Sequence, residues 1–233
     1  MLFGLFRFDW TILIVLPALI FSIYAQIKVS TTYKKYEKFY TQRRMTGADA
    51  ARRILDSNGL QHIRIEHIRG HLTDHFDPTA NVIRLSDSVY ASTSAAAIGV
   101  AAHEAGHAVQ HAQGYFPIKV RSAAIPATKV GSWFAIPLFF IGLIFASDML
   151  MLAGIVLYSC IAFFQLVTLP VEFNASSRAM KVLRTSGILN TDEQHAARQV
   201  LTAAAMTYVA ALLTSLLTLL RLLVLMGGSR DRR

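Results

Sequence analysis

Two histidines and a glutamate lie within five consecutive residues, His103–His107, in the order His-Glu-Ala-Gly-His. In an α-helix of about 3.6 residues per turn, positions four apart share one face, so His103 and His107 would point in the same direction. Two neutral imidazoles so placed can bind Zn²⁺, while Glu104 acts as a general base on the attacking water. The pattern predicts a zinc peptidase with one zinc ion per chain.

The flanking residues predict that this pattern lies inside a helix. Each of the hydroxyl residues 92–94 is a suitable N-cap, and Gly114 ends the Ala-rich segment that follows. The small residues Ala105 and Gly106 would let a neighbouring element approach this helix closely. The alternative is an amphipathic helix whose histidines only pack or contact solvent, which the mid-helix position of the motif disfavours.

A third protein ligand is required, because two histidines supply half of a tetrahedral site. His111 lies on the same face, but at a rise of about 1.5 Å per residue it is about 12 Å from His103 along the axis, too far to share a metal. Gln113 stands where a metzincin would have its third histidine. Glu172 is the better candidate, in a first turn after a helix start or kink at Pro170. Its alternative role is a charge that ends a hydrophobic segment.

The composition indicates a membrane protein, with 54% hydrophobic and only 16% charged residues. A bilayer core of about 30 Å needs about 20 apolar residues in a helix. The first of four such stretches has one basic residue before it and no clear cleavage site, so we interpret it as an anchor and not a signal peptide. The four predicted spans are Trp10–Ile27, Val130–Ser147, Met149–Val171 and Gln199–Leu220.

The spans place the two halves of the predicted site on one side of the membrane. Two spans separate His107 from Glu172, so the chain returns to the side from which it left. Positive charge is typical of cytoplasmic loops, and most of it lies on this side, which predicts a cytoplasmic catalytic side and an external N-terminus. The bordering basic residues are Lys28, Lys34, Lys35, Lys38, Arg43, Arg44, Lys119, Arg121, Lys129, Arg178, Lys181, Arg184 and Arg198.

The opposite side would carry fewer positive charges: Arg7, Arg230, Arg232 and Arg233. The basic run at residues 230–233 disagrees with this topology unless the last segment does not cross the membrane. Arg221, directly after the last span, could extend its side chain towards the far surface of the membrane. The net charge of +9 mostly borders the spans, where it matches anionic headgroups, so we expect no nucleic-acid partner. The single cysteine, Cys160, lies within the third span and is not a plausible zinc ligand.

The segment before the motif predicts a small α+β region. Thr46 caps a predicted helix at Gly47–Ser57, and two short strands are expected at Ile63–Glu66 and Asn81–Leu85, joined by the turn-rich stretch Asp74–Pro78. The strand directly before the motif could accept an extended peptide by β-augmentation, or the sheet could be purely structural.

Four histidines of this segment raise the question of a second metal site. Their spacing is irregular, and a solvated surface is the favoured interpretation. The residues are His62, His67, His71 and His75.

The chain resembles the YugP-like neutral zinc metallopeptidase family, a group of bacterial membrane proteins, over nearly its whole length. The resemblance rests on the motif with Gln110-His111 and Gly114-Tyr115 after it, on Pro170–Ser176 and on Ala203–Ala210. The family is similar to the gluzincin membrane proteases, which include the heat-shock membrane protease and the CAAX prenyl protease. In these a Glu-x-x-x-Asp pattern supplies the third ligand, and its aspartate orients the first histidine. Glu172 matches the ligand, whereas Ser176 occupies the aspartate position.

We therefore expect a mainly α protein, with integral membrane helices around a small α+β zincin-like metallopeptidase domain. It would be a multi-pass protein of the cell membrane in which His103, His107 and Glu172 bind zinc and Glu104 is the base. His195 and Tyr208 are candidate donors to the oxyanion. The substrate would be a protein or peptide at or near the membrane, membrane proteins included, and the sequence does not predict the oligomeric state. The alternative is a catalytically silent, zinc-stabilised scaffold or chaperone.

The expected organisation has five parts. They are an N-terminal anchor (1–29), a soluble segment with the motif helix (30–128), a transmembrane hairpin (129–171), a membrane-proximal segment with the third ligand (172–198), and a C-terminal transmembrane helix with a basic tail (199–233).

Overall fold

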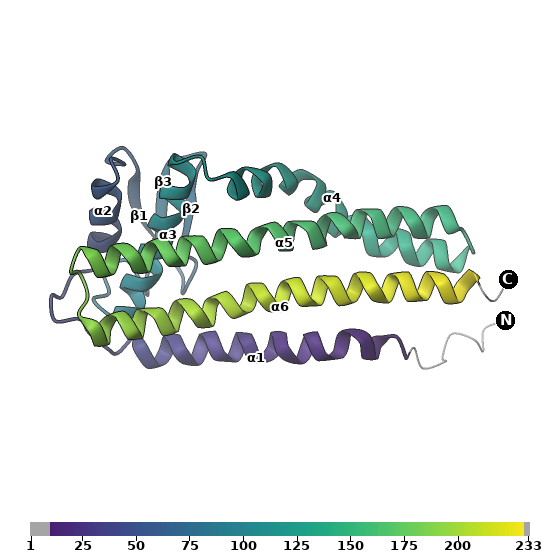
Figure 1. Cartoon of the computed structure of the whole chain (residues 1–233), viewed down its shortest axis with the longest axis horizontal. Helices are drawn as coiled ribbons and strands as arrows, with labels where there is room; N and C mark the ends of the chain where they lie inside the picture. Colours follow the sequence, from purple (N-terminus) through teal and green to yellow (C-terminus); the bar gives the residue numbers. More distant parts are fainter. Residues whose placement is uncertain (1–9, 231–233) are drawn as a thin grey trace. The chain divides into compact units, whose positions relative to one another are not determined.

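The computed structural model of the chain describes residues 10–230 and is mainly helical (Figure 1). Arg7, Arg232 and Arg233, which entered the charge comparison, lie outside the described residues, and the side chain of Arg230 is not described either. The elements are α1 (Ile12–Tyr36), α2 (Gly47–Ser57), β1 (Arg64–Ile68), β2 (His75–Asp77), β3 (Val82–Ser86), α3 (Ala95–Ala112), α4 (Phe116–Ile144), α5 (Asp148–Thr185) and α6 (Thr191–Arg230).

Contacts between residues divide the chain into two units, to which α1, α4, α5 and α6 each contribute different parts. The helical unit comprises the described residues up to Tyr24, together with Val120–Val167 and the chain from Tyr208 onward. The mixed unit comprises Ala25–Lys119 and Thr168–Thr207. The expected boundaries at 171/172 and 198/199 fall inside α5 and α6.

The helical unit is built from segments whose surfaces suit a lipid environment. The helices α1, α4, α5 and α6 are each long and apolar enough to cross a membrane. Its small core centres on Phe139, Met151 and Leu222, while large apolar side chains such as Trp133 remain exposed. A backbone whose hydrogen bonds are satisfied within helices can be placed in hydrocarbon, so this exposed apolar surface fits contact with acyl chains.

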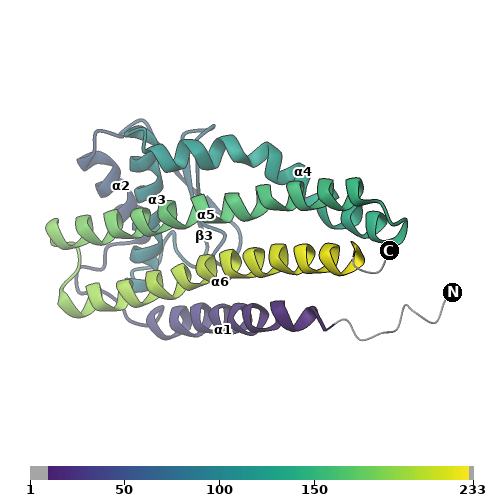
Figure 2. The ribbon, with the colours of Figure 1, turned by 45° about the vertical axis from the view of Figure 1, so that its right-hand side comes forward.

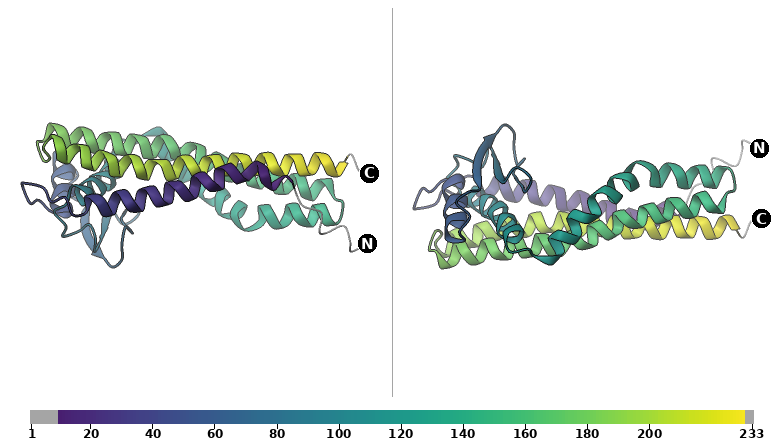
Figure 3. Two further views of the ribbon diagram at one scale, coloured as in Figure 1. Left: turned by 90° about the horizontal axis from the view of Figure 1, so that it is seen from below. Right: turned by 90° about the horizontal axis from the view of Figure 1, so that it is seen from above.

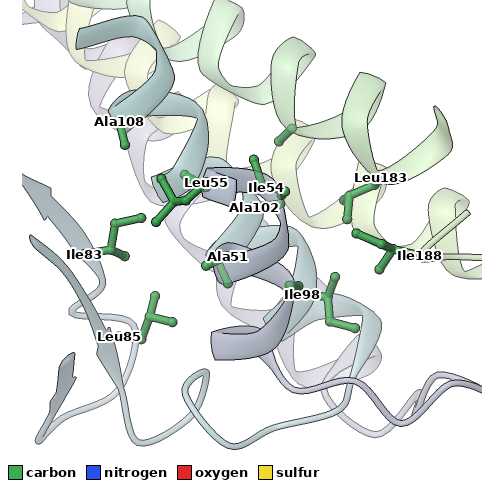
Figure 4. Packing of buried hydrophobic residues seen from close by; sticks show 14 of the residues in the cluster. Ala51, Ile54, Leu55, Ile83, Leu85, Ile98, Ala102, Ala108, Leu183 and Ile188 are labelled. Atoms are coloured by element: carbon green, nitrogen blue, oxygen red, sulfur yellow. The ribbon is translucent and has the colours of Figure 1, made fainter. Parts of the chain in front are cut away.

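The mixed unit has a three-stranded sheet in the order β1-β3-β2, with β1 parallel and β2 antiparallel to β3. Ile83 and Leu85 of β3 project from the sheet towards α2, where Ile54 and Leu55 are also fully buried (Figure 4). Burial of each such side chain stabilises the fold by about 1.5–3 kcal/mol. The same core continues to Ile98 of α3 and to the end of α5.

Local signals position the two short helices of this unit as the sequence predicts. At α2, the Thr46 hydroxyl accepts from the Asp49 N–H, and the Asp49 carboxylate accepts from the Thr46 N–H in a capping box. At α3, the N-cap is Ser94, one of the three hydroxyl residues considered, and its side chain accepts from the Ala97 N–H.

One expectation about the elements is wrong, and two possibilities that the sequence left open are excluded. His75–Asp77, expected to be a turn, forms β2. The strand before the motif, β3, is the central strand with neighbours on both sides, so it has no free edge for a peptide. Pro170 lies within α5 and does not start a helix, so Glu172 sits in mid-helix.

The segments of α5 and α6 in the mixed unit run antiparallel and are joined by the short turn between Thr185 and Thr191. The views in Figures 2 and 3 agree that these two segments lie side by side. Helix α3 packs against both of them: a Cβ atom at Gly99 would lie 3.2 Å from the Ala197 Cβ of α6, and one at Gly106 would lie 2.7 Å from the Ala175 carbonyl oxygen of α5.

Candidate metal centre

Helix α3 presents both motif histidines on one face, as the spacing predicts. The two imidazoles are perpendicular to each other, with centroids 4.6 Å apart. Their Nε2 atoms lie 3.1 Å apart and the side chains are 13% and 12% exposed for His103 and His107. Both rings therefore direct the same nitrogen to one point while remaining shielded from bulk water.

Helix α5 brings Glu172 to that point. The Glu172 Oε2 atom lies 3.2 Å from His103 Nε2 and 3.4 Å from His107 Nε2, and its side chain is 3% exposed. The absence of a side chain at Gly106 permits this approach, because a Cβ atom there would meet the backbone of Ala175. The small residue in the middle of the motif thus sets the distance between the two helices.

The spacing of these three donor atoms fits a tetrahedral zinc site. With Zn–N and Zn–O bonds of about 2.0–2.1 Å, neighbouring ligand atoms of a tetrahedron lie roughly 3.3 Å apart. The three separations observed are 3.1, 3.2 and 3.4 Å. Among the residues that the structure describes, these three alone form such a group of metal-ligating side chains. The donor set, with two imidazoles and one carboxylate, is of the kind that catalytic zinc sites use.

A buried glutamine determines which nitrogen of His107 carries the proton. Gln110 is fully buried, and its Nε2 donates to the Val171 carbonyl oxygen (2.8 Å) and to Asn174 Oδ1 (2.9 Å). Its Oε1 therefore faces His107 Nδ1, at 3.0 Å. Since an amide oxygen can only accept, His107 Nδ1 must donate, which leaves the Nε2 lone pair of the neutral ring directed at the Glu172 carboxylate.

The amide orientation is itself held by a second layer of contacts. Arg178 Nε donates to Asn174 Oδ1 at 2.7 Å, and Arg178 Nη1 donates to Gln113 Oε1. Because Asn174 Oδ1 accepts from both Arg178 and Gln110, neither amide can be reversed without losing a hydrogen bond.

His103 is supported by a single hydroxyl. Its Nδ1 lies 3.0 Å from Ser176 Oγ, at the position where the resembling proteases have an aspartate. A hydroxyl can donate or accept, so this contact orients the ring without fixing its tautomer.

The motif glutamate lies beside the edge strand of the sheet. Glu104 is 9% exposed, and its Oε2 accepts from the backbone N–H of Phe76 in β2 at 2.9 Å. This contact connects the carboxylate to a strand whose only sheet neighbour in the described chain is β3. The carboxylate therefore adjoins a strand that has no second strand neighbour in the described chain.

The charge distribution favours protonation of one histidine when no cation is present. Burial opposes the charged form of His107, but the hydrogen bond to Glu172 and the negative charges of Glu104 and Glu172 outweigh it and raise its pKa. The negative potential that produces this shift also attracts a divalent cation.

The other histidines considered from the sequence lie elsewhere. His111 contacts the Phe76 ring edge-to-face at 5.9 Å, which is a packing role. His195 is exposed and its Nε2 lies 3.3 Å from Gln199 Nε2. Tyr208 belongs to the helical unit, whereas the histidine pair belongs to the mixed unit.

The histidines of the sheet region have separate partners, as expected for a solvated surface: His67 pairs with Asp87, His71 contacts Tyr33, and His75 bonds the Thr73 carbonyl oxygen. The supporting residues Gln110, Asn174 and Arg178 were not identified from the sequence as parts of the site. The only signal was that Gln110 lies three residues after His107, on the same helical face.

Comparisons with known proteins identify the family of the chain. Residues 11–227 match the family described as "Putative neutral zinc metallopeptidase". A relative from Bacillus subtilis (strain 168), named "Putative membrane protease YugP", is 46% identical over 220 residues, covering 94% of this chain and 98% of the relative. No solved structure matches the chain.

Proposed function

Because the chain belongs to the family of neutral zinc metallopeptidases, we propose that it hydrolyses peptide bonds of proteins at the membrane, with His103, His107 and Glu172 as the zinc ligands. The observation that carries this proposal is the spacing of the three donor atoms, which matches the edges of a zinc tetrahedron. Zinc bound there supplies Lewis acidity, which acidifies water and polarises the peptide carbonyl.

Glu104 is the proposed general base. Its carboxylate follows His103 in the motif and is held by the Phe76 N–H on the side of the edge strand. It takes the proton of the attacking water and passes it to the leaving amine, a transfer that a partly buried carboxylate performs in general acid–base catalysis. In this scheme Gln110 and Ser176 are positioning residues that act through the histidines.

The edge strand β2 is the proposed docking site for an extended peptide, in place of β3. The described sheet has two edge strands, β1 and β2, and β2 is the one whose Phe76 N–H contacts Glu104. A substrate that pairs with this edge would present its backbone carbonyls next to the base.

The predicted excess of basic residues beside the spans supports a cytoplasmic position for the mixed unit.

The test compares wild type with Glu104→Gln, which keeps the size of the side chain but removes its basicity. We expect near-stoichiometric zinc in both, and cleavage of casein or a membrane-protein substrate by wild type alone, with a loss of at least about a thousandfold in the variant. Glu66→Gln, on the partly exposed strand β1, is the control and should remain active, because its carboxylate pairs with Arg64 and Arg84. Full activity of Glu104→Gln would disprove the hydrolytic mechanism, whereas zinc binding without proteolysis in wild type would favour a silent scaffold.

A further inference from the structure

A groove of about 500 Å³ lies in the mixed unit between α5 and α6. Its apolar part includes Phe173, Met180 and Leu201, and its cationic part includes Lys181, Arg184 and Arg198. No acidic side chain lines the described groove. The groove is distinct from the proposed metal centre, although Ser176, which bonds His103, forms part of its wall.

The three cations of this groove have no partner among the described residues. Lys181, Arg184 and Arg198 are exposed, and within the described residues none forms an ion pair or a side-chain hydrogen bond. Three positive side chains on one concavity repel one another, and the repulsion is relieved when an anion binds between them. An anionic ligand therefore fits the cationic part.

Polarity changes systematically along the groove. On α5 it runs from Phe173, two residues beyond the apolar stretch that ends at Val171, to Lys181 and Arg184 farther from that stretch. On the antiparallel α6, Leu201 lies within the apolar stretch and Arg198 immediately precedes it. On each helix the apolar residue Phe173 or Leu201 is thus nearer to the predicted span than the cations are, whereas Met180 lies beside Lys181.

We propose that this groove binds an anionic phospholipid. The phosphate would lie between the cations, and the part of an acyl chain next to the headgroup would lie against the apolar part. Basic residues next to a membrane span recognise anionic headgroups in this way, and the apolar end adds a contact that a free phosphate cannot make. An acidic peptide would match the cations, but it would leave the apolar end next to the span without a complementary partner.

The test is equilibrium binding by the full-length zinc-loaded protein in a neutral detergent. Phosphatidylglycerol, phosphatidylcholine, glycerol phosphate and hexaglutamate are titrated in turn. We expect phosphatidylglycerol to bind at least tenfold more tightly than the other three. In Arg184→Gln/Arg198→Gln its affinity should fall about 25-fold, since each of the two cations contributes about fivefold.

The matched control is Lys28→Gln/Lys34→Gln, which removes two exposed cations that also border a predicted span, on α1. Its phosphatidylglycerol affinity should stay within twofold of wild type. Phe173→Ala should weaken phosphatidylglycerol binding but leave glycerol phosphate binding unchanged. Zinc content and the melting temperature verify that each variant is folded.

Three results would overturn the proposal. An equal loss of phosphatidylglycerol affinity in both double variants would indicate that general surface electrostatics drive the binding. Equal affinity for glycerol phosphate and phosphatidylglycerol would show that the acyl chain makes no contact with the groove. Tighter binding of hexaglutamate, lost in the groove variant while lipid binding persists, would assign the groove to an acidic peptide. None of these measurements depends on proteolysis, so the proposed enzymatic function can fail or succeed separately.

Discussion

The two motif histidines occupy the same helix face but have different support. His107 Nδ1 donates to the amide oxygen of Gln110 on the same helix. The Gln110 amide nitrogen donates to Asn174 on α5, and Asn174 also accepts from Arg178 of α5. The Nδ1 atom of His103 has the rotatable hydroxyl of Ser176 as its partner, while its Nε2 faces Glu172 and His107. The comparison indicates that the protein fixes the tautomer of His107 by a buried network and leaves the tautomer of His103 adjustable.

Substitution of Gly106 by alanine should disturb the contacts of both His103 and His107 with α5, so we expect it to have the largest effect on zinc affinity. The new Cβ would lie 2.7 Å from the Ala175 carbonyl oxygen, so α5 must move, carrying Asn174 and Ser176 with it. Overpacking of this kind costs about 1–3 kcal/mol, which exceeds the roughly 1 kcal/mol gain in helix propensity. We expect a lower melting temperature and a loss of zinc affinity of more than about a hundredfold, measured by competition with a chromophoric chelator.

Gly228→Ala is the control for this substitution, because it places a methyl group on helix α6 where no atom lies within 4 Å. Its zinc affinity should equal that of wild type. If Gly106→Ala also binds zinc normally, the interhelical distance does not determine the geometry of the site.

The sequence predicts the parts of this arrangement that are local. The histidine spacing, the caps Thr46 and Ser94 and the apolar stretches all depend on neighbouring residues, and the structure contains the corresponding elements. Glu172 was identified by elimination and resemblance, and the structure brings it to the histidines. The strand β2 escaped prediction because three residues give too short a pattern, and pairing with β3 stabilises them.

The hydrogen-bond network could not be predicted for a related reason. The role of Gln110 depends on the Val171 carbonyl oxygen, 61 residues away, which is available only because the two helices pack at Gly106. A sequence pattern gives the direction of a side chain on its own helix and does not give the backbone that it meets.

Replacement of Gln110 by methionine should reduce zinc affinity through His107 alone, because it removes the acceptor that fixes the tautomer of this histidine. The variant fills a similar volume but leaves His107 Nδ1 without its acceptor and removes the side-chain hydrogen bond to the Val171 carbonyl oxygen. Zinc affinity should fall about 10- to 100-fold, the range expected when the partner of a ligating histidine is removed. In Gln110→Glu an acceptor for Nδ1 is retained, so we expect zinc affinity near that of wild type with a lower melting temperature. Equal zinc loss in both variants would contradict the tautomer argument.

Loss of the Ser176 hydroxyl, the partner of His103 Nδ1, should reduce zinc affinity less than loss of Gln110 does, and a different partner should increase zinc affinity. Ser176→Ala removes one hydroxyl contact, for which we expect a three- to tenfold loss of zinc affinity. Ser176→Asp supplies an acceptor that cannot donate when ionised, so it should fix the Nδ1–H tautomer and raise zinc affinity above wild type. A loss of affinity in Ser176→Asp would show that the carboxylate does not reach Nδ1, or that His103 binds through a different arrangement.

The smallest effect is expected at Arg178, which acts on His107 through two intervening side chains. Arg178→Gln removes the donor to Asn174 Oδ1 and the contact with Gln113, but Gln110 still bonds the Val171 carbonyl oxygen. Because that bond alone can hold the amide orientation, zinc affinity should fall only two- to threefold by the same chelator competition. In the Gln110→Met background the Arg178 substitution should have no further effect on zinc, since the network no longer reaches His107. Additive losses in the double variant would mean that Arg178 influences the metal centre by a route other than Gln110.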